Sequence, residues 1–197
     1  MAFTVVYDAD VLHPASLRDL LVRLATTNLF RARWTDATLD EMVKSVLDKN
    51  PDLSAGQLDR TRALMVKAVP DCMVTGFEPL IPSIELPDPD DRHVVAAAVR
   101  CNAGVIVTSN VRDFPDDALA PFNIEAQSPD IFVLHLLELE PGTVVSTIAR
   151  QAAGLRRPPQ TYEQLLDRLG TVGLSRSVAL MRSQGRSQRW LKNLPNL

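Results

Sequence analysis

The chain has 197 residues, of which 46% are hydrophobic and 23% are charged, and its net charge is −3, which is typical of a globular protein. No apolar run approaches the roughly 18 residues that a membrane-spanning helix needs, and the N-terminus lacks the basic region of a signal peptide. We therefore expect a cytoplasmic protein that does not enter the membrane. Cys72 and Cys101 have no Cys-x-x-Cys spacing, which favours two buried free thiols over a redox or metal site.

The charge is distributed unevenly along the chain. Residues 1–140 hold 12 Lys and Arg against 22 Asp and Glu, whereas residues 141–197 hold nine against two. A basic C-terminal segment on an acidic body suggests an anionic partner for the segment. A solvated helical face, or docking of the segment on the acidic body itself, explains the pattern equally well.

The first predicted elements are a buried strand, a helix and a second strand. Residues 3–7 are short, apolar and β-branched, and the run ends abruptly at Asp8. Leucines at helical spacing predict a helix that starts near Ser16, and residues 31–34 are the second strand candidate.

Two further helices follow in the sequence. Thr38 and Glu41 have the Ser/Thr-x-x-Glu spacing of a capping box, which predicts a helix that opens at this point. Apolar spacing predicts another helix over residues 54–69, and Pro70 ends it.

The central part of the chain contains the strongest helix and strand signals. Asp88 suits an N-cap and Pro89 suits the first helical position, ahead of an alanine-rich helix over residues 93–100. Residues 105–108 form the clearest buried strand, and residues 124–126 are one more candidate. Strands that alternate with helices predict an α/β fold with a parallel sheet flanked by helices.

The sequence changes character after residue 130, where we expect helices alone. We therefore predict an α/β domain over residues 1–130 and a helical C-terminal segment over residues 131–197. The expected helices, with a proline-containing break at residues 156–159, span 130–139, 143–153, 162–169 and 175–183.

Four acidic residues from distant segments fall at one edge of the expected sheet. Asp8 ends the first strand, Asp113 follows the strand at residues 105–108, and Asp91 and Glu41 lie at helix starts. Ligands of parallel α/β sheets bind beyond the carboxyl ends of the strands. Each acid alone has a structural explanation, as a cap, a helix-dipole partner or a turn residue. Together they favour a site for a hard cation such as Mg²⁺ or Mn²⁺, which would activate water for phosphodiester hydrolysis.

The segments that contain Asp8, Glu41, Asp91 and Asp113 resemble, in this order, the signatures of PIN-domain nucleases. The resemblance covers about residues 1–128 and is closest to the VapC-like toxins of toxin–antitoxin pairs. The resemblance implies a metal-dependent endoribonuclease with an RNA substrate and a small antitoxin partner. It also implies that Asp8, Asp91 and Asp113 bind the metal and that Glu41 helps to hold the metal or its waters. A homodimer is one possible oligomeric state.

Some positions stay open within this resemblance. Many members have an acid where this chain has Asn110, so either Asn110 or Asp113 could lie nearer the metal. Asp88 and Asp90 compete with Asp91, and Asp10 is a candidate supporting group.

Three alternatives to the toxin remain. A nuclease with a role in RNA processing would use the same residues, and a non-catalytic binding module would keep the fold alone. Asp8 and Asp10 also mimic the paired aspartates of a haloacid-dehalogenase-like phosphatase, although Leu12 does not fit that motif.

Overall fold

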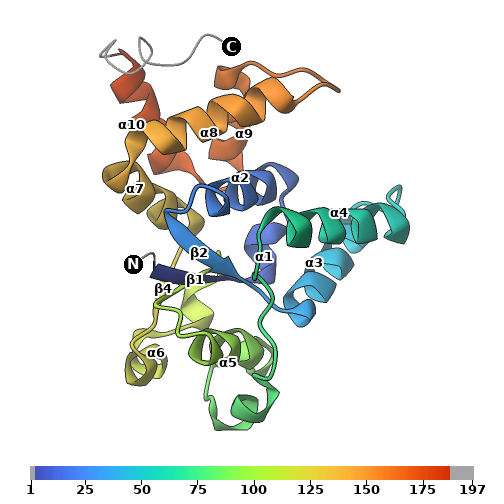
Figure 1. Cartoon of the computed structure of the whole chain (residues 1–197), viewed down its shortest axis with the longest axis vertical. Helices are drawn as coiled ribbons and strands as arrows, with labels where there is room; N and C mark the ends of the chain where they lie inside the picture. Colours follow the sequence, from blue (N-terminus) through green and yellow to red (C-terminus); the bar gives the residue numbers. More distant parts are fainter. Residues whose placement is uncertain (1–2, 187–197) are drawn as a thin grey trace. The chain divides into compact units, whose positions relative to one another are not determined.

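The computed structural model describes residues 3–186, with side chains to residue 183. The chain divides into two compact units, Met1–Ser128 and Pro129–Leu197, which are described separately (Figure 1). Within the described range, every helix is too short or too polar to cross a bilayer.

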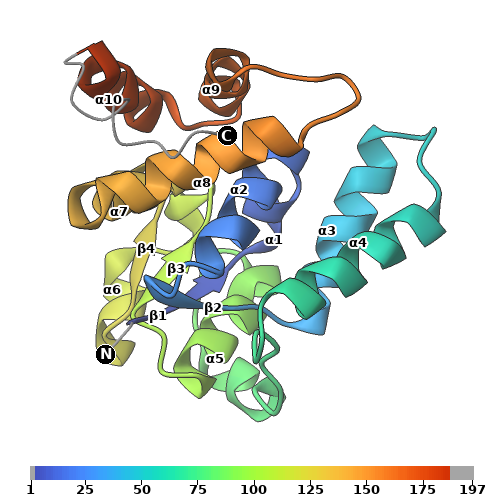
Figure 2. The same cartoon turned by 45° about the horizontal axis from the view of Figure 1, so that its top comes forward.

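A four-stranded parallel sheet forms the centre of the first unit, with the strand order β2-β1-β3-β4 (Figure 2). The strands are β1 (Phe3–Tyr7), β2 (Phe30–Arg33), β3 (Val105–Val107) and β4 (Glu125–Gln127). In the register, Val5 pairs with Val105, and Val105 pairs in turn with Glu125. Apolar residues of the two central strands are buried because helices cover both faces of the sheet. The predicted parallel α/β architecture is confirmed.

Helix α2 lies on one face of this sheet and α5 on the other (Figures 1 and 2). Helices α3 and α4 lie side by side and extend away from the sheet. The α-helices of this unit are α1 (Ala9–Leu12), α2 (Ala15–Ala25), α3 (Asp36–Lys49), α4 (Ala55–Ala68), α5 (Arg92–Arg100) and α6 (Asp116–Leu119). Its 3₁₀ helices are η1 (Glu78–Ser83), η2 (Pro89–Asp91), η3 (Val111–Asp113) and η4 (Ala120–Phe122).

The predicted capping box at Thr38 and Glu41 is wrong. Helix α3 begins at Asp36, and its N-cap is Thr35, whose hydroxyl accepts the Thr38 amide at 3.0 Å. Thr38 therefore lies inside the first turn, and Glu41 lies beyond it. The predicted N-cap at Asp88 is confirmed, although the turn that it caps is the 3₁₀ helix η2.

The cysteines match the expectation in part. Both are free, but only Cys72 is buried, whereas Cys101 at the end of α5 is partly exposed. Burial raises the pKa of the Cys72 thiol to about 11, which leaves it an inert core side chain at neutral pH.

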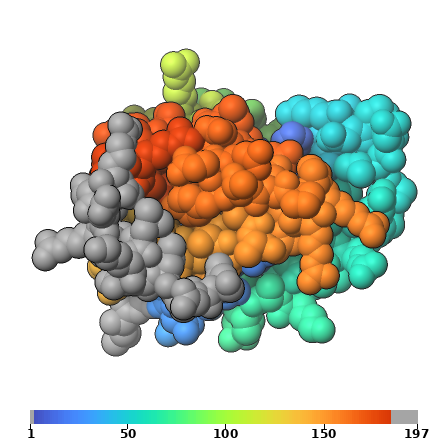
Figure 3. All heavy atoms as spheres, turned by 90° about the horizontal axis from the view of Figure 1, so that it is seen from above, coloured from blue at the N-terminus to red at the C-terminus, as the bar shows by residue number. Residues whose placement is uncertain are grey.

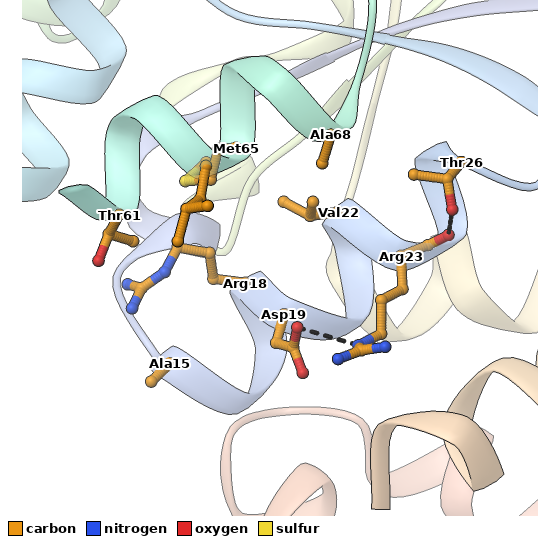
Figure 4. Close-up of a pocket in the computed structure, with 10 residues that line it drawn as sticks. Ala15, Arg18, Asp19, Val22, Arg23, Thr26, Thr61, Met65 and Ala68 are labelled. Carbon is orange, nitrogen blue, oxygen red and sulfur yellow. Dashed lines mark hydrogen bonds and ion pairs between the residues drawn. The ribbon is translucent and has the colours of Figure 1, made fainter. Parts of the chain in front are cut away.

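A groove of about 550 Å³ lies between α2 and α4 (Figure 4). Val22, Leu64 and Met65 supply apolar walls, and Arg23 forms an ion pair with Asp19 at 3.0 Å along one side. Leu64 is 57% exposed. The groove thus presents apolar surface to the solvent on the first unit.

The second unit is a helical bundle, and the predicted helices are confirmed with small shifts at their ends. They are α7 (Pro129–Leu139), α8 (Pro141–Gly154), α9 (Tyr162–Thr171) and α10 (Ser175–Arg186). Figure 3 shows α8 and α9 (orange) on one face of this unit. Its core consists of leucines and other apolar residues that all four helices contribute, because each helix has one apolar face.

A buried carboxylate ties α7 to the start of α10. Asp130 is 7% exposed, and its side chain accepts the amides of Arg176 at 2.9 Å and Ser177 at 2.8 Å. The Ser177 hydroxyl donates a third hydrogen bond to it at 2.7 Å. These amides belong to the first turn of α10 and would otherwise lack partners, so Asp130 acts as the cap of that helix.

We expect Asp130→Ala to lower the free energy of unfolding by roughly 2 kcal/mol, because it leaves buried donors of α10 unsatisfied. Asp130→Asn keeps one acceptor oxygen and should cost less. Urea unfolding monitored by circular dichroism measures both. Glu138→Ala, at an exposed position of α7, is the matched control. Equal stability of Asp130→Ala and this control would show that the cap contributes nothing.

Candidate active site

The carboxylate of Asp8 lies at the carboxyl end of the central strand β1 and is 5% exposed. It accepts the hydroxyl hydrogen of Thr108 at 2.7 Å and the amide hydrogen of Ala9 at 2.6 Å. Burial raises the pKa of Asp8, and the charge of Glu41 raises it further, against the opposing effect of these hydrogen bonds and of His93. Two hydrogen bonds leave lone pairs on a carboxylate that a cation can use.

Asp10 follows on α1 and binds the loop after β3. Its carboxylate accepts the amides of Ser109 at 2.9 Å and Asn110 at 3.1 Å, and the Thr108 hydroxyl lies 3.3 Å away. Burial and the charge of Asp8 raise the pKa of Asp10 to about 6. The side chain of Asp10 therefore fixes the loop that leads to η3 and to Asp113. From the sequence, Asp10 is a candidate supporting group.

Asp91 ends η2 and lies close to three other carboxylates. Its pKa is raised to about 7, first by burial and then by the charges of Asp8, Asp88 and Asp113. The charges of Asp8 and Asp113 therefore act on Asp91 at the carboxyl edge of the sheet. Asp90 is exposed, and its amide donates to the Asp88 side chain at 2.9 Å.

Asn110 contributes to this edge through its backbone. Its amide binds Asp10, whereas its side chain lies on an exposed loop that lines a hollow of about 400 Å³ with Ser109, Val111, Arg112 and Asp113. Asp113 ends η3 in the same loop and affects the pKa of Asp91.

Glu41 reaches the same edge from α3. Its carboxylate is 48% exposed and lies 3.0 Å from Nε2 of His93, whose side chain is 12% exposed. Burial lowers the pKa of His93, but the contact with Glu41 and the charges of Asp8 and Asp91 outweigh burial and raise it overall. His93 is thus an imidazole inside a cluster of carboxylates.

The donor chemistry of this edge fits a hard divalent cation, because it consists of carboxylates whose charges oppose one another. As placed, no three His, Cys, Asp or Glu side chains in the described part of the chain converge closely enough to hold an ion. The site therefore has the ligand types of a metal centre without a closed set of ligands.

The sequence interpretation missed two residues at this edge. Thr108, which the sequence places at the end of a strand, is fully buried and donates to Asp8 across 100 positions of the sequence. The sequence assigns no role in the site to His93. A hydroxyl directly after a buried strand, and a histidine two positions after an acid at a helix start, are the signals that pointed to them.

Stability of the metal-free protein should fall as the pH rises from about 4 to about 7. The pKa of Asp91 is raised to about 7 from 3.8, so the folded state retains a proton that the unfolded state has released. Asp91→Asn removes this proton-binding group and should flatten the slope. Urea unfolding in EDTA across this pH range measures it, with Asp116→Asn on α6 as the control. If the free energy of unfolding depends on pH equally in Asp91→Asn and in the wild-type chain, the raised pKa of Asp91 is contradicted.

Comparisons with known proteins agree with the fold. The family model described as "PIN domain" matches residues 4–112, more than half of the chain, and the model described as "VapC50 C-terminal domain" matches residues 129–183. Over 80 residues the chain is 49% identical to "Putative ribonuclease VapC50" of Mycobacterium tuberculosis, a stretch that covers 41% of this chain and 47% of that protein. The match thus spans about half the length of that relative. No solved structure matches the chain.

The hydrogen bonds of Asp10 also bear on the alternative of a haloacid-dehalogenase-like phosphatase. In that reading Asp10 would need a free carboxyl group for acid–base work, but its carboxylate is occupied by the loop amides. The resemblance seen in the sequence is confirmed, and the chain belongs to the PIN domain family.

Proposed function

We propose that this chain is a metal-dependent endoribonuclease and the toxin of a toxin–antitoxin pair, acting in the cytoplasm. The observation that carries the proposal is the buried carboxylate of Asp8, which follows the central strand of a PIN-family sheet and accepts the hydroxyl of Thr108 from the end of the neighbouring strand. The similarity to a protein named as a ribonuclease supports the choice of RNA as substrate.

In this proposal Asp8, Asp91 and Asp113 would hold Mg²⁺ or Mn²⁺, and Glu41 would hold the ion or its waters. When bound, such an ion polarises a phosphate and activates a water. Thr108 orients the carboxylate of Asp8, and Asp10 fixes the loop that carries Asp113. Cation binding would also relieve the repulsion that raises the pKa of Asp91.

An antitoxin is the proposed protein partner. The groove between α2 and α4 supports this, because Leu64 is 57% exposed beside it on a chain whose described residues bury most of their large hydrophobic side chains. A homodimer would cover the same kind of surface, and the mass of the purified chain in solution separates the two.

The basic C-terminal segment is proposed to have a mainly structural role. Within the described residues, Arg182 forms ion pairs with Glu163 at 3.2 Å and with Asp167 at 2.6 Å, which occupy its guanidinium. The side chains of Arg186 and Arg189 lie outside the described residues. An RNA-binding role predicts that changing these three arginines to Ala flattens the salt dependence of RNA binding.

We expect Asp8→Asn to abolish Mg²⁺- or Mn²⁺-dependent cleavage of RNA while the protein stays folded. Asp91→Asn and Asp113→Asn should behave alike, and Asp90→Asn should be milder because that side chain is exposed. Gel analysis of a labelled RNA, with each ion and with EDTA, measures this.

Asp117→Asn, at an exposed position of α6, is the control for these variants. Mn²⁺ should also raise the melting temperature of the wild-type chain more than that of Asp8→Asn, because an ion that binds only the folded state stabilises it. Full activity in Asp8→Asn, or wild-type cleavage in EDTA, would refute the proposed site.

Expression of the chain alone in bacteria should arrest growth, because unchecked RNA cleavage stops protein synthesis. Asp8→Asn should relieve the arrest at equal protein level. Growth curves with immunoblots measure both. A wild-type chain that cleaves RNA in vitro and yet permits normal growth would favour the RNA-processing role.

A further inference from the structure

We propose that His93 is a positioning residue for Glu41, whose carboxylate it holds toward the acidic cluster by donating a hydrogen bond from Nε2. This inference rests on the proposed function, in which Glu41 takes part in the site. It assigns a role to a buried histidine that the proposed chemistry does not otherwise use.

The contact joins two helices that approach the site from different parts of the chain. Nε2 of His93, in the first turn of α5, lies 3.0 Å from Oε1 of Glu41 on α3. Neither ring nitrogen has a well-aligned partner among the described residues. Alignment of the Nε2–H with Oε1 requires rotation about the second side-chain torsion, which is broad in histidine.

Glu41 needs such a partner because its own surroundings do not fix it. Its side chain is 48% exposed, and a long exposed glutamate samples many conformations. The charge of Asp8 also opposes it, since the charge of Glu41 raises the pKa of Asp8. Without an attractive contact, the carboxylate of Glu41 would turn away from the cluster into solvent.

His93 is well placed to supply that attraction. Its side chain is 12% exposed and starts from the first turn of a buried helix, so it moves little. It also starts two positions after Asp91, which ends η2, so one imidazole contacts the exposed carboxylate of Glu41 from the segment that carries Asp91.

Two amide substitutions distinguish positioning from simple packing. The amide of His93→Gln reaches about as far as Nε2 and can still donate to Glu41, whereas the shorter amide of His93→Asn stops near the position of Nδ1. We expect His93→Asn to lower kcat/KM for RNA cleavage by about 10- to 100-fold, the range typical for groups that orient a ligand. His93→Gln should recover most of that loss.

A double-mutant cycle tests whether the effect passes through Glu41. In the Glu41→Ala background, His93→Asn should cost little further activity, because the carboxylate that it orients is gone. Equal losses in His93→Asn and His93→Gln, or a full loss in the Glu41→Ala background, would overturn the inference. Melting temperatures show whether each variant folds.

Nitrogen NMR of the metal-free protein tests the contact without any activity. The chain has three histidines, His13, His93 and His135, so the imidazole signals can be assigned by substitution. Glu41→Ala should shift the Nε2 signal of His93, whereas Asp40→Ala, a neighbour that pairs with Arg62, should not. A His93 signal that ignores Glu41→Ala would refute the contact.

The two proposals can fail separately. A wild-type chain that does not cleave RNA with either ion would refute the proposed function, and the NMR experiment would still decide whether His93 holds Glu41. An active chain with an unchanged His93 signal would refute only the positioning role.

Discussion

The hydrogen bond from Thr108 to Asp8 is the contact on which the rest of the site depends. Asp8 and Thr108 follow the two central strands, and the amide of Asp8 donates to Val107 at 3.1 Å, which extends the pairing of β1 and β3. A buried carboxylate is costly unless it is hydrogen-bonded. The partner here comes from a strand 100 positions away, so the carboxylate can be buried only after the sheet has formed. The site around Asp8 therefore forms only when the sheet forms.

The fold also imposes an electrostatic cost at the carboxyl edge of the sheet. Parallel strands direct their carboxyl ends to the same side, and the acids that follow them are brought close whether or not a cation is present. The raised pKa values of Asp8, Asp10 and Asp91 express this cost, since each group would ionise more readily in water. A site in which negative charges are disfavoured is stabilised when it binds a cation. In the second unit, hydrogen bonds from three donors to the carboxylate of Asp130 offset the cost of its burial.

The sequence predicted the sheet well because its strands are short β-branched runs and its helices have one apolar face. It predicted the location of the acidic cluster because chain direction alone places strand ends together. It failed at Thr38, since Thr35 and Thr38 are both suitable caps and only the backbone conformation of Thr35 decides between them. It missed His93 and Thr108 because their local signals do not identify the distant residues, Glu41 and Asp8, that each of them contacts.

The two aspartates at the start of α1 show how one short segment serves two purposes. Asp8 turns toward the cluster, whereas Asp10, two positions later, binds the backbone of the loop after β3. This arrangement explains why an asparagine at position 110 is compatible with the proposed site. The loop uses the amide of Asn110 and not its side chain, so the acid can come later, from Asp113 at the end of η3. The charge of Asp113 contributes to the raised pKa of Asp91, so a carboxylate three positions after Asn110 still acts on this edge of the sheet. Asp10, by binding the amides of Ser109 and Asn110, orders the start of the loop from which Asp113 comes.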